Sequence, residues 1–107
     1  MTRILLALLL FAALPLRAAE PVDLTGTFQG IEQGDYAYFL LRTDAGDDES
    51  LMILQTDAAL EEFVEHADAL KGTRVKVRVE DRRENITEAG GEIDVRVIVG
   101  VAKLPPR

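Results

Sequence analysis

Two tyrosines two residues apart, Tyr36 and Tyr38, are the side chains of this chain best suited to holding a ligand. In a strand, residues i and i+2 point to the same face, so the two rings would form a platform on which a base, a sugar or another ring could stack. Arg42 follows on the same predicted strand, and Asp35 precedes Tyr36 in a turn. We therefore take Tyr36, Tyr38, Arg42 and Asp35 as candidate ligand-binding residues. The alternative is that the tyrosines cover an edge of the core.

An acidic segment follows, with Asp44, Asp47, Asp48 and Glu49 inside six residues. Hard cations such as Ca²⁺ take about 6–8 oxygen ligands, several of them from carboxylates. The segment is therefore a candidate cation site, although its spacing differs from that of the EF-hand loop. The alternative is a solvated hairpin loop.

The basic residues of the second half form the main positive concentration of the chain. A polyanion or an acidic partner could bind them. The last predicted strand carries Glu92, Asp94 and Arg96, and opposite charges on neighbouring strands pair favourably, so we expect cross-strand salt bridges. The basic residues are Arg74, Lys76, Arg78, Arg82 and Arg83.

No group of residues predicts catalysis. His66 is the only histidine and the chain has no cysteine, so Cys-ligated metals, thiol chemistry and a second imidazole for a shared metal are all excluded. Carboxylates are plentiful, but no pattern pairs two of them. We expect no catalytic residues, no resident metal and no cofactor, and we predict that the protein is not an enzyme.

The amino-terminal residues 1–19 have the composition of a secretory signal peptide. Arg3 supplies the positive charge, 4–14 is an unbroken apolar run, and small residues follow at Ala18 and Ala19. The run is shorter than the roughly 20 residues that a spanning helix needs. We expect a cleaved signal peptide over 1–19, a single domain over 20–107, no permanent membrane anchor, and a periplasmic or secreted location in a Gram-negative bacterium.

The net charge of the chain restricts its partners. The formal charge is −7, and loss of the leader removes Arg3 and Arg17 but no acid, which leaves −9. Binding a polyanion requires a positive footprint, so we expect nucleic acid not to be a partner. A small or cationic ligand is compatible with this charge. We expect the domain to be monomeric.

Hydrophobic periodicity predicts five strands and one helix. Alternation of apolar and polar residues indicates strands over 22–31, 73–80 and 92–101, and short apolar runs indicate strands over 36–42 and 51–55. The helix is expected between an N-cap at Asp57 and a stop at Gly72, with an apolar stripe formed by Leu60, Phe63, Val64, Ala67 and Leu70.

Three finer features are also expected. Gly26 and Gly30 predict a bulge or bend in the first strand, and 81–91 is expected to be a polar loop. The alternating residues of the last strand are expected to share the core face; they are Ile93, Val95, Val97, Val99 and Val101.

The predicted order, β-β-β-α-β-β, is that of the OB-fold, a five-stranded barrel. A β-sandwich would need more strands, and a doubly wound sheet would alternate strands with helices. The chain is therefore expected to be mainly β, with one helix, in a small OB-fold-like barrel; another small α+β sheet is the alternative.

Four short segments of the chain resemble a bacterial OB-fold family of small periplasmic proteins, some of them linked to envelope stress. They open the first strand, precede the aromatic strand, precede the third strand and open the last strand: 22–26, 34–39, 44–46 and 92–95. The resemblance implies an exported binding domain for a small or cationic ligand.

Two hypotheses of function follow. The first is a non-enzymatic binding module that uses the tyrosine face or its flanking loops for a small or cationic ligand. The second is an interaction or adaptor protein that docks onto another envelope protein through a barrel edge or the helix.

Overall fold

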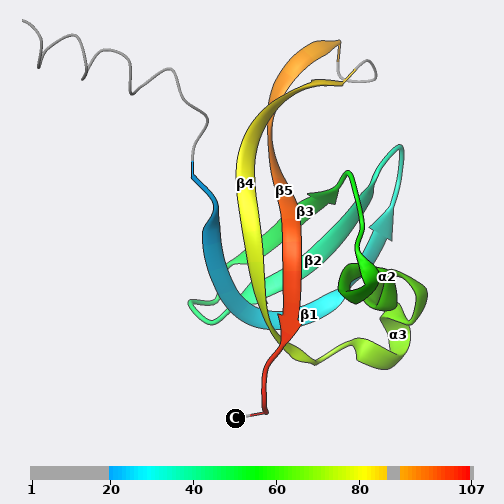
Figure 1. Cartoon of the computed structure of the whole chain (residues 1–107), viewed down its shortest axis with the longest axis vertical. Coiled ribbons are helices and arrows are strands. Elements are labelled where there is room, and N and C mark those ends of the chain that lie inside the picture. The colour runs from blue at the N-terminus through cyan, green and yellow to red at the C-terminus, as the bar shows by residue number, and fades with distance from the viewer. Residues whose placement is uncertain (1–19, 87–89, 107) are drawn as a thin grey trace, which may run out of the picture.

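Five strands close into a barrel in the computed structural model, which describes residues 20–86 and 90–106 (Figure 1). The strands follow the order β1-β2-β3-β5-β4 around the barrel, and only the contact between β3 and β5 is parallel. Two short helices lie between the third and fourth strands. This is the arrangement of the OB-fold, so the predicted fold class is confirmed. The elements are β1 (Val22–Gln33), β2 (Ala37–Thr43), β3 (Asp48–Ile53), α2 (Ala58–Glu65), α3 (Ala67–Leu70), β4 (Arg74–Ile86) and β5 (Gly91–Lys103).

The barrel interior is filled by aromatic and branched side chains. Phe28, Phe39 and Phe63 contact one another, with ring centroids 4.7, 4.9 and 5.6 Å apart. Aromatic pairs at such distances add to the stabilisation from buried area alone. We call this interior the barrel core; its buried members are Phe28, Phe39, Leu41, Leu51, Leu60, Phe63, Val75, Val77, Val79 and Ile98.

Strand β1 bends around the barrel at its glycines. The pairing of β1 with β2 shifts register between Phe28 and Gly30, and Gly30 has φ +135°, a conformation that L side chains rarely adopt. At Gly26 a Cβ atom would run into the carbonyl oxygen of Arg42 on β2. The predicted bulge is confirmed.

The predicted helix begins as expected and then breaks. Asp57 caps α2, because its side chain accepts a hydrogen bond of 2.9 Å from the Leu60 N–H. His66 leaves helical geometry, with φ −121° and ψ 39°, and ends α2. The shorter α3 then packs against β1, where Ala67 and Leu70 contact the barrel core. The single predicted helix is therefore two helices, which meet at His66.

The predicted leader, residues 1–19, lies outside the residues that the structure describes. Among residues 20–86 and 90–106, no helix has the length and the apolar composition required to cross a bilayer.

Strands β4 and β5 extend past the barrel as a curved two-stranded arm (Figure 1). Pairing of β1 with β4 begins at Val22 and Val79, and Pro21, which lacks an N–H, precedes it. We define the arm as residues 80–86 and 91–97. The predicted polar loop over 81–91 is wrong: 81–86 and 91 are strand, and 87–89 lie outside the described residues. Charged residues of the arm form ion pairs across its two strands. These ion pairs stabilise a ladder that has few apolar residues.

The last strand does not keep one core-facing stripe. The register of β4 and β5 shifts at one point. Arg78 lies opposite Gly100 and Val79 lies opposite Ile98, so Val99 is an extra residue in β5. Because a one-residue slip reverses every side chain, Ile98 and Val101 contact the barrel core. Val97 packs in a second cluster on the other face of the strand. The predicted single face is therefore wrong.

Candidate functional site

The outer face of β2 and β3 carries the candidate tyrosines. Phe39 and Leu41 of β2 point into the barrel core, so the alternating residues Tyr38 and Arg42 point outward. Tyr38 lies opposite Met52 of β3. In OB-folds this face of strands two and three, with the loops around it, is where oligonucleotides and oligosaccharides bind. The chain thus presents an aromatic residue at the usual ligand position of its fold.

A second apolar cluster, which we call the outer cluster, joins this face to the arm. Its buried members are Met52, Ile86 and Val97, with exposed fractions of 3%, 6% and 0%. The arm therefore covers part of the β2–β3 face rather than standing free of it. Partly buried residues packed against these three are Tyr36, Tyr38, Ile93, Val95 and Val99.

One row of side chains crosses all five strands on this face. The register pairs Glu32 with Tyr38, Tyr38 with Met52, Met52 with Val97, and Val97 with Glu80. Residues directly opposite each other share a face of the sheet. The row therefore has an aromatic and apolar centre and a carboxylate at each end. We call it the cross-barrel row.

The two carboxylates of the row differ in their surroundings. Glu80 accepts hydrogen bonds from Arg82, whose Nε and Nη2 are both 2.8 Å from its Oε1, and Glu84 lies 3.9 Å from the same guanidinium. Glu32 is exposed and has no hydrogen-bond or ion-pair partner among the described residues. Only the β1 end of the row offers a carboxylate whose charge is not already matched.

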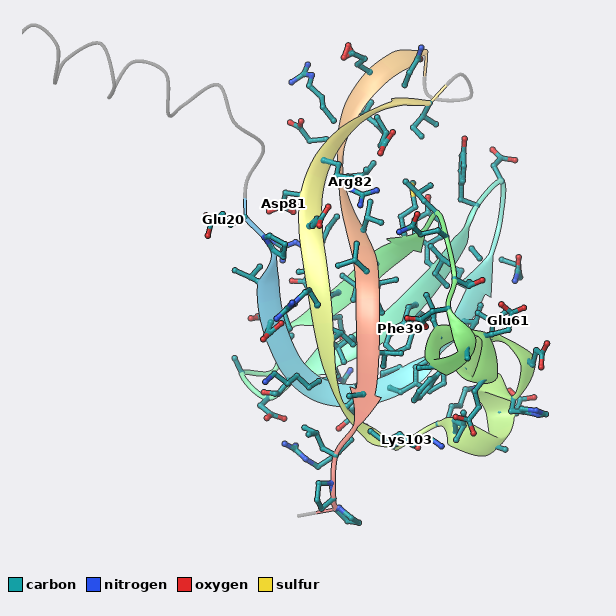
Figure 2. All side chains as sticks on the ribbon, viewed as in Figure 1. Glu20, Phe39, Glu61, Asp81, Arg82 and Lys103 are labelled. Atoms are coloured by element: carbon teal, nitrogen blue, oxygen red, sulfur yellow. The ribbon has the colours of Figure 1, made fainter. Side chains whose placement is uncertain are left out.

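An arginine ties the arm to the barrel. Arg96 of β5 donates to Asp81 across the arm, with Nε to Oδ1 at 2.9 Å, and to Glu49 of β3 at 3.2 Å. Asp81 and Arg82 lie where the arm leaves the barrel (Figure 2). The hydrogen bond from Arg96 holds the pKa of Asp81 below its usual value. The arm is thus held by the outer cluster on one face and by these ion pairs on the other.

The arm also carries a shallow hollow of about 500 Å³. Three of its lining residues are arginines, and each of them is paired with a carboxylate of the arm or of β3. The lining residues are Asp81, Arg82, Arg83, Asp94, Val95 and Arg96.

The four predicted ligand-binding residues are only partly brought together. Tyr36 and Tyr38 both pack against the outer cluster. Asp35 is exposed in the turn before Tyr36, on the Glu32 side of the row. Arg42 lies farther along β2 and pairs with Asp48 at 3.0 Å. The hydrogen bond from Arg42 lowers the pKa of Asp48, so this arginine is engaged by the neighbouring strand.

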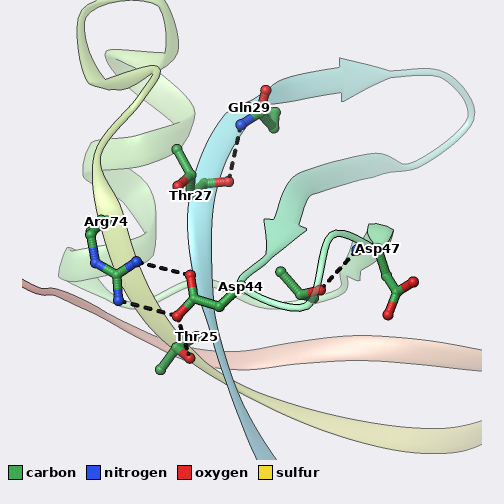
Figure 3. A network of polar contacts seen from close by, with 7 residues as sticks. Thr25, Thr27, Gln29, Asp44, Asp47 and Arg74 are labelled. Atoms are coloured by element: carbon green, nitrogen blue, oxygen red, sulfur yellow. Dashed lines mark hydrogen bonds and ion pairs between the residues drawn. The ribbon is translucent and has the colours of Figure 1, made fainter. Parts of the chain in front are cut away.

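The four predicted cation-binding carboxylates do not converge. Asp44 pairs with Arg74 at 2.8 Å and accepts from the Thr25 hydroxyl at 3.1 Å, as Figure 3 shows. Asp47 turns away, and its backbone N–H donates to the Thr43 hydroxyl. Asp48 and Glu49 pair with arginines of two other strands. Among residues 20–86 and 90–106, no three His, Asp or Glu residues come together in a way that could hold a metal ion.

The predicted cross-strand salt bridges are present. Every Lys and Arg side chain in the described part of the chain has a carboxylate within 4.0 Å. Arg83 contacts Asp94 and Glu92 as expected, whereas Arg78 and Lys76 share Asp23 of β1. His66 lies at the break between α2 and α3 and is exposed.

The sequence indicated the tyrosines as candidate residues, but the arm that packs beside them was not predicted. Val97 and Ile86 were expected in the core face and in a loop, and Glu80 had no expected role. The missing information was the β3–β5 contact, which joins Met52 to Val97. The alternation of Ile93, Val95 and Val97 continues outside the barrel, and it was the available signal for a second apolar face.

Comparisons with known proteins support the class of fold. No protein-family model matches the chain, and no curated protein matches it. Among solved structures, the mitochondrial single-stranded DNA binding protein Rim1 of S. cerevisiae is similar, with a TM-score of 0.54 at 11% sequence identity. The similarity covers 79% of this chain and 92% of that one. The shared feature is the OB-fold.

This similarity corrects one prediction about partners. We expected nucleic acid not to be a partner because the chain is acidic. Rim1 is described as a single-stranded DNA binding protein, so the exclusion of nucleic acid is wrong for a barrel of this kind. Net charge sums the whole surface, whereas binding depends on the groups of one face. Charge alone therefore does not decide the ligand.

Proposed function

We propose that the protein is an exported, non-enzymatic OB-fold module that binds a small or cationic ligand on the outer face of β2 and β3. The observation that carries the proposal is the outer cluster. Tyr36 and Tyr38 remain half-buried beside Met52 and Val97 at the ligand position of the fold. Ligand sites are mostly apolar with a few placed polar groups, and Glu32, Asp35 and Glu80 supply such groups here.

A thermal-unfolding scan of the purified protein against a ligand panel tests the proposal. The panel holds Ca²⁺, Mg²⁺, Zn²⁺, polyamines, cationic peptides, short oligonucleotides and glycan fragments. A ligand that binds only the folded state at a hundredfold excess over its Kd stabilises it by about 2.7 kcal/mol. A dose-dependent rise of the midpoint, lost in Tyr38→Leu and kept in Glu65→Gln on α2, is the expected result.

Single-stranded nucleic acid is a second candidate ligand, favoured by the description of Rim1 and by the tyrosines, on which bases stack. The salt dependence of the affinity distinguishes single-stranded nucleic acid from a small ligand. Binding that rests on several phosphate contacts weakens steeply as salt rises, whereas a small ligand that makes one charged contact loses much less affinity. An oligothymidylate titration at two salt concentrations separates the two candidates.

The adaptor hypothesis is the alternative from a different class. The arm supports it. Pairing of β4 with β1 stops at Val79, and pairing of β5 with β3 begins at Val97, so both strands of the arm have an open edge. Open strand edges accept further strands. A flat response across the ligand panel, followed by a specific crosslink from the arm to another envelope protein, would replace the binding module with the adaptor.

Export is proposed from the leader sequence and from the resemblance to periplasmic OB-fold proteins, which also suggests a link to envelope stress. Expression of the full chain in a Gram-negative host, followed by intact-mass measurement of the envelope fraction, tests it. We expect a protein that begins at Ala19 or Glu20. Full-length protein in the cytoplasmic fraction would contradict the proposal.

A further inference from the structure

The cross-barrel row carries more information about the ligand than the tyrosines alone. Its centre consists of Tyr38, Met52 and Val97, which all belong to the outer cluster. Tyr38 is only half-buried, whereas Met52 and Val97 are 3% and 0% exposed. A ligand can therefore reach the Tyr38 ring, which lies over the covered centre, but not Met52 or Val97.

The charges beside the row are unbalanced. Glu32 and Asp35 at the β1 end are exposed and have no partner among the described residues. At the arm end, Glu80 and Glu84 share the single guanidinium of Arg82. The surroundings of the apolar centre thus contain four carboxylates but one cationic side chain, Arg82. Arg42 does not change this balance, because it is paired with Asp48.

We infer that the site selects an amphipathic cation: a flat apolar group carrying an ammonium or guanidinium. This inference rests on the proposed function and names its ligand class. The ring stacks on the exposed part of Tyr38, and the cationic group donates to the carboxylate of Glu32, which lies on β1 opposite Tyr38. The tyrosine face also attracts a cation directly. At the other end of the row, Glu80 is already hydrogen-bonded to Arg82, so Glu32 is the selecting residue.

Two indole probes of opposite charge separate ring binding from charge selection. Tryptamine carries an ammonium and indole-3-propionate carries a carboxylate on the same ring. The protein has no Trp, so the indole fluorescence and its anisotropy report the probe alone. We expect tryptamine to bind at least about tenfold more tightly at low salt, since hydrogen bonds to charged groups are the stronger class.

Three variants assign this selectivity to residues. Glu32→Gln should weaken tryptamine binding about tenfold and leave indole-3-propionate no weaker. Tyr38→Leu should weaken both probes. Glu65→Gln removes an exposed carboxylate on α2, a helix that contributes no residue to the row, and should change neither. Equal unfolding midpoints of Glu32→Gln and the parent protein show that the fold is unchanged.

The outcomes separate this inference from the proposed function. Equal affinity for the two probes, both lost in Tyr38→Leu, would overturn charge selection and keep the binding face. A tryptamine preference unchanged by Glu32→Gln would overturn the role of that residue. Oligothymidylate binding that strengthens in Glu32→Gln and displaces tryptamine would overturn the cationic class. Binding of neither probe would overturn this inference, and a flat response in the wider ligand panel would overturn the proposed function as well.

Discussion

The barrel core and the outer cluster are built from similar residues but differ in completeness. The barrel core buries ten residues, two of them from α2, and contains three mutually packed phenylalanines. The outer cluster buries three residues, and its two tyrosines stay partly exposed beside carboxylates. The buried residues of the barrel core are at most 2% exposed, so they cannot contact a ligand. The outer cluster has an apolar surface that the fold does not finish covering, which is the property expected of a binding face.

The largest expected difference between the two regions is in stability. Phe63→Ala removes a ring that contacts both other phenylalanines, and should lower the free energy of unfolding by about 3–5 kcal/mol. Met52→Ala should cost about 2 kcal/mol, because the half-open cluster can relax around the change. Chemical denaturation of both variants measures the difference. Equal losses would mean that the outer cluster is as much a part of the folding core as the barrel interior.

The helix that closes the barrel offers a second test. Asp57→Ala removes the acceptor for the Leu60 N–H and should cost about 1 kcal/mol. Because Leu60 belongs to the barrel core, we expect a lower unfolding midpoint with unchanged ligand binding. Asp57→Asn, which keeps a capping oxygen, is the matched control and should restore most of the loss. A change in tryptamine affinity in Asp57→Ala would contradict the separation of the two regions.

The attachment of the arm is expected to have a smaller effect. Arg96→Met removes the hydrogen bonds to Asp81 and Glu49 while keeping much of the side-chain volume. These groups are partly exposed, so the cost should be about 0.5–1 kcal/mol. Hydrogen exchange should accelerate in the arm and not in β1 or β2. Arg42→Met, which breaks an ion pair within the barrel wall, is the control and should leave exchange in the arm unchanged.

Acid should produce the smallest effect, and its sign follows from the pKa shifts. Hydrogen bonds from arginines lower the pKa values of Asp23, Asp48 and Asp81 in the folded protein. A lowered folded pKa gives stability that is present above the unfolded pKa, about 3.9 for Asp, and is lost as pH falls through the folded pKa. The unfolding midpoint should therefore decline below about pH 4. Asp81→Asn should flatten part of that decline, and an unchanged slope would contradict the assignment.

The sequence predicted those parts of the fold that depend on local pattern. The N-cap at Asp57, the bulge at Gly30 and the inward face of β4 all follow from residue type and spacing, and the structure confirms them. Strand order then follows, because a five-stranded barrel with one helical connection has few solutions.

The candidate site was harder to predict, because it depends on register between distant strands. Glu32, Tyr38, Met52, Glu80 and Val97 are separated along the chain and meet only once the barrel closes. The arm was hidden because alternating charges resemble a polar loop when their cross-strand partners are unknown. The side of β5 on which Val97 lies could not be predicted, because a single extra residue, Val99, reverses the direction of the side chains along the strand.

An amide chemical-shift map of the protein titrated with tryptamine shows most directly where the ligand binds. We expect α2 and α3 to be unchanged and the largest shifts to fall on Glu32, Tyr36, Tyr38, Met52 and Val97. Shifts concentrated on the helices or on the 44–49 segment, with the cross-barrel row silent, would contradict the claim that the outer face of β2 and β3 is the binding site.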